Sequence, residues 1–104
     1  MMPYDMMYDG NLAFRWAAMH GHLHTCRWLK KVCKMNKEDM MIKDNEAFQL
    51  AALYGRLHIC KWLADICNMN KDDVMAADNY AFRYANDYNI RDWLSEKFGI
   101  TEDS

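Results

Sequence analysis

A chain of 104 residues is long enough for one domain, and its 52% hydrophobic residues are enough to build a core. A formal net charge of −2 and a pI near 6.0 give no electrostatic reason to expect binding to nucleic acid or to an acidic membrane. No apolar run approaches the roughly 20 residues that span a bilayer. We therefore expect no nucleic-acid partner, no membrane and, since the start lacks a basic and an apolar region, no secretory signal.

The strongest pattern in the sequence is a repeat with a period of 34 residues. An Ala-Phe pair recurs three times at this offset, ending at Phe14, Phe48 and Phe82. The same offset relates tryptophans, cysteines and methionines: Trp28 and Trp62, Cys26 and Cys60, Cys33 and Cys67, Met35 and Met69. A fixed period of this length is typical of stacked repeat proteins. The sequence therefore predicts a single all-α domain, a solenoid of about three helix–turn–helix repeats over residues 1–104.

The chain is expected to begin partway through a repeat, because residues 5–7 match residues 39–41 at the repeat offset. Residues 1–9 are therefore interpreted as a partial N-terminal unit that supplies apolar side chains but no complete capping helix. An apolar end of this kind could be covered by another copy of the chain. Self-assembly as a homodimer through the N-terminal end, or continuation as a fragment of a longer array, is thus the alternative function.

Repeat one is assigned to residues 10–43 and contains two expected helices. Asn11 is predicted to cap the first helix, since Asn side chains accept from unpaired N–H groups of a first turn. Gly21 is predicted to end it in the left-handed conformation. Apolar residues then recur at helical spacing: Phe14, Ala17, Ala18, Cys26, Leu29, Val32 and Cys33. Residues 36–39 resemble a capping box that opens one further helical turn.

Repeat two, residues 44–77, reproduces this pattern closely, whereas repeat three, residues 78–104, is shortened. Trp93 falls 31 residues after Trp62, so three residues are missing, and they are assigned to the link between the two helices. Polar residues are much commoner in this unit than in the first two. A polar terminal repeat is what a solenoid needs to face water, so residues 78–104 are predicted to form a C-terminal cap.

The four cysteines are expected to be reduced. The two in each repeat are seven residues apart, which is about 10 Å along a helix and beyond the ~7 Å limit for Cα atoms that share a disulfide. Cysteines on adjacent helical layers would also be about 10 Å apart. Small apolar thiols of this kind are typical of a reducing compartment, so the chain is expected in the cytoplasm, or in the host cytoplasm if it is viral.

The segments A-F-R-W-A-A-M-H-G-H-L and A-F-Q-L-A-A-L-Y-G-R-L resemble the ankyrin repeat, whose motif has a T-P-L-H-x-A-A-x-x-G-H core. The alanine pairs, Gly21 and Gly55, and the second-helix leucines match that motif. The usual Thr-Pro is replaced, and the loop reads M-N-K-E-D-M-M, so the finger between repeats is expected to be a short helical turn. This form looks like the divergent arrays of large DNA viruses and some protists.

The resemblance implies a non-catalytic scaffold that binds another protein on a concave face made by the fingers and the first helices. Mapped onto this chain, His20, Tyr54 and Tyr88 form a column with one ring per repeat, although the same rings could instead pack within the array. Tyrosine and methionine are favoured in interface cores. The candidate binding residues are Tyr8, Asp9, Leu12, Met19, His20, Ile42, Lys43, Glu46, Leu53, Tyr54, Tyr80, Asp87 and Tyr88.

Other aromatic residues are predicted to be structural. Trp16, Leu50 and Tyr84 occupy the position of an inner-helix apolar residue and are expected in the core. A second set is expected to pack between the second helices: Trp28, Trp62 and Trp93.

Catalytic, cofactor and metal sites are not expected. The histidines at 20, 22 and 24 are separated by a helix-ending glycine, with no carboxylate or Cys spaced to complete a tetrahedral zinc site. The sequence contains no glycine-rich phosphate loop and no nucleophile–base arrangement.

Overall fold

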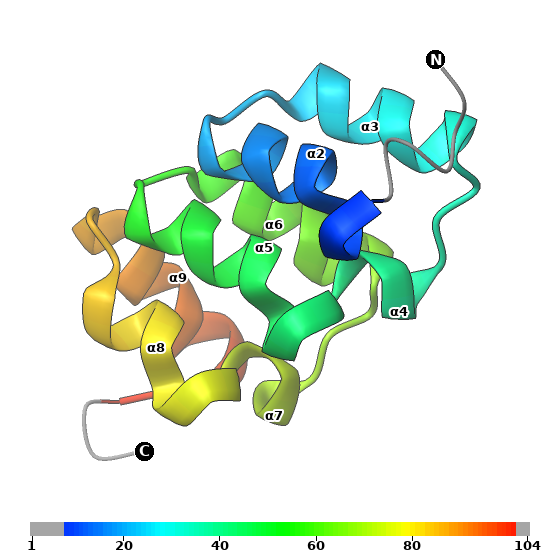
Figure 1. Cartoon of the computed structure of the whole chain (residues 1–104). Helices are drawn as coiled ribbons and strands as arrows, with labels where there is room; N and C mark the ends of the chain where they lie inside the picture. The colour runs from blue at the N-terminus through cyan, green and yellow to red at the C-terminus, as the bar shows by residue number, and fades with distance from the viewer. Residues whose placement is uncertain (1–7, 102–104) are drawn as a thin grey trace.

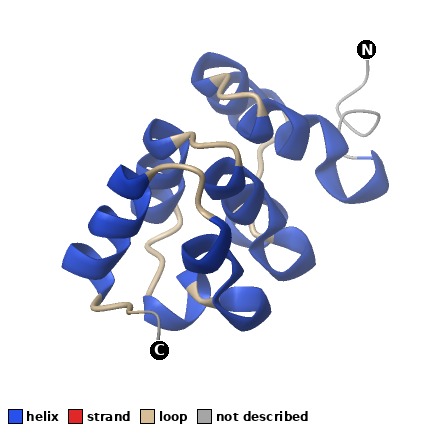
Figure 2. Ribbon diagram, turned by 90° about the vertical axis from the view of Figure 1, so that its left-hand side faces the viewer, coloured by secondary structure: helices blue, strands red, loops and turns tan. Residues whose placement is uncertain are grey.

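The computed structural model describes residues 8–101, with side chains from Asn11 onward, and this part of the chain is built of helices and loops (Figure 2). Each repeat contributes a first, inner helix and a second, outer helix. The inner helices are α2 (Tyr8–Met19), α5 (Ile42–Leu53) and α8 (Ala76–Tyr84); the outer helices are α3 (Leu23–Val32), α6 (Leu57–Ile66) and α9 (Tyr88–Phe98). Figure 1 shows the inner helices side by side in front of the outer ones. The all-α repeat prediction is confirmed.

Two four-residue helices, α4 (Lys37–Met40) and α7 (Lys71–Val74), link consecutive repeats. Each opens with the predicted capping box. In α4, Asp39 N–H donates to the Asn36 side chain at 2.8 Å, and Asn36 N–H donates to the Asp39 carboxylate at 3.1 Å. The equivalent pair in α7 has distances of 2.8 and 3.0 Å. The finger is therefore a helical turn, as expected, because four N–H groups at a helix start need such acceptors.

The predicted glycine stops are also confirmed. Gly21 and Gly55 have φ of 77° and 75°, where a Cβ would be strained. Around Gly21, the His22 N–H donates to Ala17 O at 2.9 Å and the Gly21 N–H to Ala18 O at 3.2 Å. Repeat two makes the same two bonds around Gly55. This Schellman arrangement pairs the last helical carbonyls and turns the chain back toward the outer helix.

The predicted N-cap role of Asn11 is wrong. Its Nδ2 donates instead to Asp39 O in the following turn, at 2.8 Å, and Asn45 makes the matching bond to Asp73 O at 3.0 Å. Both side chains are buried, and within the described part of the chain their Oδ1 atoms have no partner. Capping requires an extended backbone, whereas Asn11 and Asn45 have φ of 64° and 65°. The asparagines therefore tie the start of an inner helix to the turn that leads into the next repeat, rather than cap helices.

The junction at the start of α5, and the equivalent junction at the start of α8, each contain three consecutive left-handed residues. These are residues 43–45, with φ from 56° to 65°, and residues 77–79, with φ from 57° to 61°. Asp and Asn tolerate this conformation better than other non-glycine residues, while Lys43 and Ala77 have no such advantage. The junction is a tight reversal held by the packing around it.

The core lies between the layers and contains alanines and one phenylalanine from each inner helix, together with aliphatic and cysteine side chains from the outer helices. Ala17, Ala18, Ala51 and Ala52 are fully buried, and small residues let helices approach closely. Aromatic pairs join neighbouring repeats: Phe14 lies 6.1 Å from Trp62, and Phe48 lies 6.3 Å from Trp93, between ring centroids.

The shortening of repeat three lies in its inner helix and not in the link between helices, which corrects the predicted position of the gap. The first two inner helices end eight residues after Asn11 and Asn45, at Met19 and Leu53, but α8 ends at Tyr84, five residues after Asn79. The Asn86 N–H then donates to Ala52 O of repeat two, at 3.1 Å. One turn of helix is thus replaced by an extended link.

The left-handed junction predicts a stabilising substitution. Ala77→Gly should raise the free energy of unfolding by roughly 0.5–1 kcal/mol, because the relief of left-handed strain exceeds the entropy cost of glycine. Ala76, which lacks a positive φ, is the matched control, and Ala76→Gly should lower stability by about 0.5–1 kcal/mol. Urea unfolding followed by circular dichroism measures both changes. A lowered unfolding midpoint for Ala77→Gly would contradict the left-handed backbone assigned to Ala77.

The cysteines predict an order of thiol reactivity. All four carry reduced thiols, and burial raises the pKa of Cys26 to about 12 and of Cys67 to about 11, with the pKa of Cys60 raised further still. Since the thiolate is the reactive form, these three should resist a thiol reagent at neutral pH until the chain unfolds. Half-buried Cys33 should react first. Timed labelling with peptide mapping checks this, and Cys60 labelling as fast as Cys33 would disprove it.

Candidate functional site

The solvent-facing side of the inner helices carries large apolar side chains. Leu12 and Trp16 are each 51% exposed, Tyr54 is 42% exposed and Tyr84 is 54% exposed. We call this surface, together with half-buried Leu50, the inner face. Its members recur at four-residue spacing along a helix or at the 34-residue repeat, so they share one side of α2, α5 and α8. Exposed aromatic residues gathered in this way mark interaction surfaces more often than scattered ones do.

The prediction that Trp16, Leu50 and Tyr84 lie in the core is wrong for the two aromatic residues. Each inner helix packs through its buried phenylalanine and alanines, which on α2 include Phe14. Trp16 and Tyr84 lie on the other side of their helices and point to solvent. Aromatic residues at helical spacing are usually core, and the sequence holds no separate signal that this position faces water. These two residues are therefore absent from the binding residues predicted from the sequence.

The N-terminal part of the inner face is a cluster of rings around Trp16. The Trp16 ring lies 4.5 Å from that of His20 and 5.6 Å from that of His22, and the two imidazoles stack at 6.2 Å. Of the predicted column, His20 is thus half-buried against Trp16, while Tyr54 is exposed.

Hydrogen bonds from the second repeat hold the loop that carries this cluster. Arg56 Nε donates to Met19 O at 3.1 Å, and His58 Nε2 lies 3.0 Å from Gly21 O. Arg56 was not among the predicted residues, because a charged residue in a loop gives no sequence signal of such a bond. The bonds fix the first two loops relative to each other.

A partly buried ion pair joins the first two inner helices. The Arg15 guanidinium on α2 pairs with the carboxylate of Glu46 on α5, and the Arg15 side chain is only 7% exposed. A buried arginine needs such a partner. Glu46, a predicted binding residue, is therefore already engaged in joining two inner helices.

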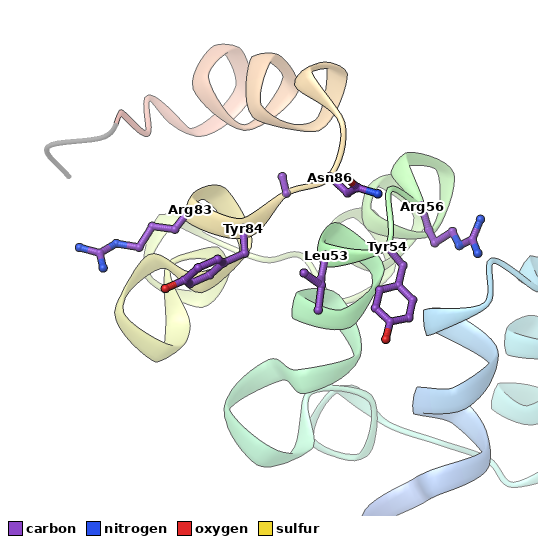
Figure 3. Close-up of a pocket in the computed structure, with 7 residues that line it drawn as sticks. Leu53, Tyr54, Arg56, Arg83, Tyr84 and Asn86 are labelled. Carbon is purple, nitrogen blue, oxygen red and sulfur yellow. The ribbon is translucent and has the colours of Figure 1, made fainter.

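An open hollow of about 570 Å³ lies where α8 ends early. Figure 3 shows Leu53 between Tyr54 and Tyr84 along this hollow, with the guanidinium groups of Arg56 and Arg83 directed to opposite sides. Ala85 and Asn86, from the extended link, complete the lining. The missing helical turn therefore exposes the end of α5 that α8 would otherwise cover.

Tyr88 does not continue the predicted column. It is the first residue of α9 and so corresponds to Leu23 and Leu57, the first residues of α3 and α6. Its side chain is 79% exposed, and it lines a smaller hollow of about 220 Å³ with Asp87. Asp87 caps α9, accepting from the Asn89 N–H at 2.9 Å.

The remaining predicted residues lie on the finger side. Tyr80 is half-buried with its ring 4.7 Å from that of Tyr84, so it supports the inner face. Ile42 is half-buried and Lys43 is exposed at the start of α5. Tyr8 and Asp9 lie in the first turn of α2, with side chains outside the described part. Residues 1–7 of the expected partial N-terminal unit also lie outside it.

Packing by the outer-helix tryptophans is confirmed for Trp62 and Trp93, which are half-buried against Phe14 and Phe48. It is not confirmed for Trp28, which is 51% exposed.

Within the described residues no three His, Cys, Asp or Glu side chains are grouped as metal ligands would be. No described helix combines the length and apolar character needed to cross a membrane.

Comparison with known families agrees with the observed architecture. A family model described as ankyrin repeats (many copies) matches residues 14–64, about half of the chain. No curated protein and no solved structure shows significant similarity to this chain. The resemblance to viral and protist arrays stays a prediction. The matched segment spans the paired helices, alanine pairs and glycine stops of repeat one and most of repeat two, and the chain belongs to the ankyrin-repeat family.

Proposed function

We propose that this chain is a protein-interaction module that binds a partner on its inner face, which corresponds to the concave face of the family. Ankyrin repeats generally act as protein-interaction modules and are generally non-catalytic. The observation that carries the proposal is the exposure of Trp16 and Tyr84 on the same side of the first and third inner helices. Large aromatic side chains left in water by the fold gain most from being covered by a partner.

The geometry suits a binding surface with a central anchor region. Aromatic residues that present a flat ring at low entropy cost dominate the energy of many interfaces. Trp16 is supported by two imidazoles, and Tyr84 by the ring of Tyr80. These contacts limit the freedom of the exposed rings before a partner arrives, which lowers the entropy cost of binding.

The hollow beside Tyr84 supplies a place for a partner side chain. Leu53 and Tyr54 offer apolar surface there, while Arg83, which lies 3.7 Å from Asp78 in an exposed ion pair, stands at its edge. An apolar centre with polar groups at the rim is the usual composition of an interface. We expect a partner to insert an apolar side chain at this point.

A reducing compartment such as the cytoplasm is part of the proposal, supported by the four reduced cysteines in the described chain. We also propose that neither a cofactor nor a catalytic residue is involved.

The test is a double substitution on the inner face. Trp16→Ala with Tyr84→Ala should weaken binding to a captured partner on the order of 100-fold, since two anchor residues are lost, and leave helical content unchanged because both rings are half-exposed. Lys61→Ala with Asp65→Ala, two exposed positions on α6, is the matched control and should bind normally. Unchanged affinity of the Trp16/Tyr84 variant for the same partner would exclude the inner face.

Self-assembly through the N-terminal end is the second candidate, favoured by exposed Trp28. Against it, Thr25 and Lys30 stand where repeat two has the buried Ile59 and Ala64, so this end is more polar than an internal boundary. We give the inner face precedence for this reason.

Solution mass separates the two candidates. Light scattering over a wide concentration range should give a constant mass near 12.4 kDa, because the polar substitutions in α3 reduce the apolar area available to a second copy. A mass that doubles with concentration, and does not double for Trp28→Ala, would instead establish the dimer.

A further inference from the structure

The outer helix of repeat one has a charge pattern that the other outer helices lack. Between residues 22 and 37 there is no Asp or Glu, while Arg27, Lys30, Lys31 and Lys34 are all cationic. Within the described part of the chain, no carboxylate forms an ion pair with these four. Lysines in a last turn favour the helix dipole, but Arg27 lies too early for that. The patch is basic although the whole chain is acidic.

An uncovered aromatic residue lies within this basic patch. Trp62 and Trp93 each lie against a phenylalanine from the inner helix of the preceding repeat. Trp28 is the equivalent of Trp62 and is 51% exposed, without such a ring among the described residues. The fold itself thus shows which kind of group covers this position, namely an apolar ring presented by a neighbouring helix.

Helical spacing places the charges and the ring together. Lys31 and Val32 follow Trp28 by three and four residues, so both lie next to it on the helix surface. Trp28, Val32, Lys31 and the adjacent Arg27 are all exposed. The outer face of α3 therefore presents an apolar strip flanked by cations, on the opposite layer from the inner face.

We propose that the outer face of α3 docks an acidic amphipathic helix of another protein. An aromatic or leucine side chain of that helix covers Trp28 as Phe14 covers Trp62, and its Asp or Glu residues pair with Arg27 and Lys31. Complementary charge steers such a helix to the patch and fixes its register, while the burial of Trp28 supplies affinity. This surface is independent of the inner face, so one chain could hold two proteins at once.

The test uses a fluorescein-labelled synthetic helix of roughly 14 residues, four turns long, with Phe and Leu on one side and Glu on the others. Fluorescence anisotropy should show binding that weakens as salt is raised, since exposed charges are screened. Arg27→Glu with Lys31→Glu should weaken binding by about tenfold or more. Lys61→Glu, at the position equivalent to Arg27 on α6, is the control and should bind as the unmodified protein does.

Two further probes make the result decisive. A peptide with every Glu changed to Lys should not bind, and Trp28→Ala, with its fold checked by circular dichroism, should bind the acidic peptide several-fold more weakly; if that variant does not fold, the charge reversals decide. Equal binding by the Arg27/Lys31 variant, or by the lysine peptide, would overturn the proposal. So would retention by phosphatidylserine vesicles or by an RNA oligonucleotide without binding of the acidic peptide.

Discussion

One buried asparagine per junction sets the spacing of this solenoid. Asn11 and Asn45 each donate to a carbonyl in the next inter-repeat turn, and their left-handed backbone lets the chain reverse within three residues. A buried amide donor without such an acceptor would cost more than the bond contributes. The link therefore allows one register between neighbouring repeats, and the inner helices are aligned by it.

The alignment has a consequence for the surface. Because consecutive inner helices keep one register, positions 34 residues apart face the same way, and Trp16 and Leu50 share a side with Tyr84 despite the shortening of repeat three. The loss of one helical turn then interrupts the pattern beyond Tyr84 and uncovers Leu53 and Tyr54. The three residues missing from repeat three thus create a hollow beside exposed rings. In a less regular fold, a deletion of this size would only shorten a loop.

The two proposed surfaces lie on different layers of the fold, one on the inner helices and one on an outer helix. The inner face depends on rings supported by other rings, with the Arg15–Glu46 ion pair joining α2 to α5, whereas the α3 face depends on unpaired cations around Trp28. The first should be insensitive to salt and the second sensitive to it. Repeat one contributes to both, through its inner and its outer helix.

Sequence periodicity alone determined the repeat, its helices, the capping boxes and the glycine stops, because each depends on residues close together in the chain. It also indicated reduced cysteines and the ankyrin family. The tertiary structure alone decided that Asn11 bonds to the turn that leads into the next repeat, that Trp16 and Tyr84 face water, and that the gap in repeat three removes a helical turn. These depend on which side of a helix meets its neighbour, and residue spacing defines the sides of a helix without saying which one is covered.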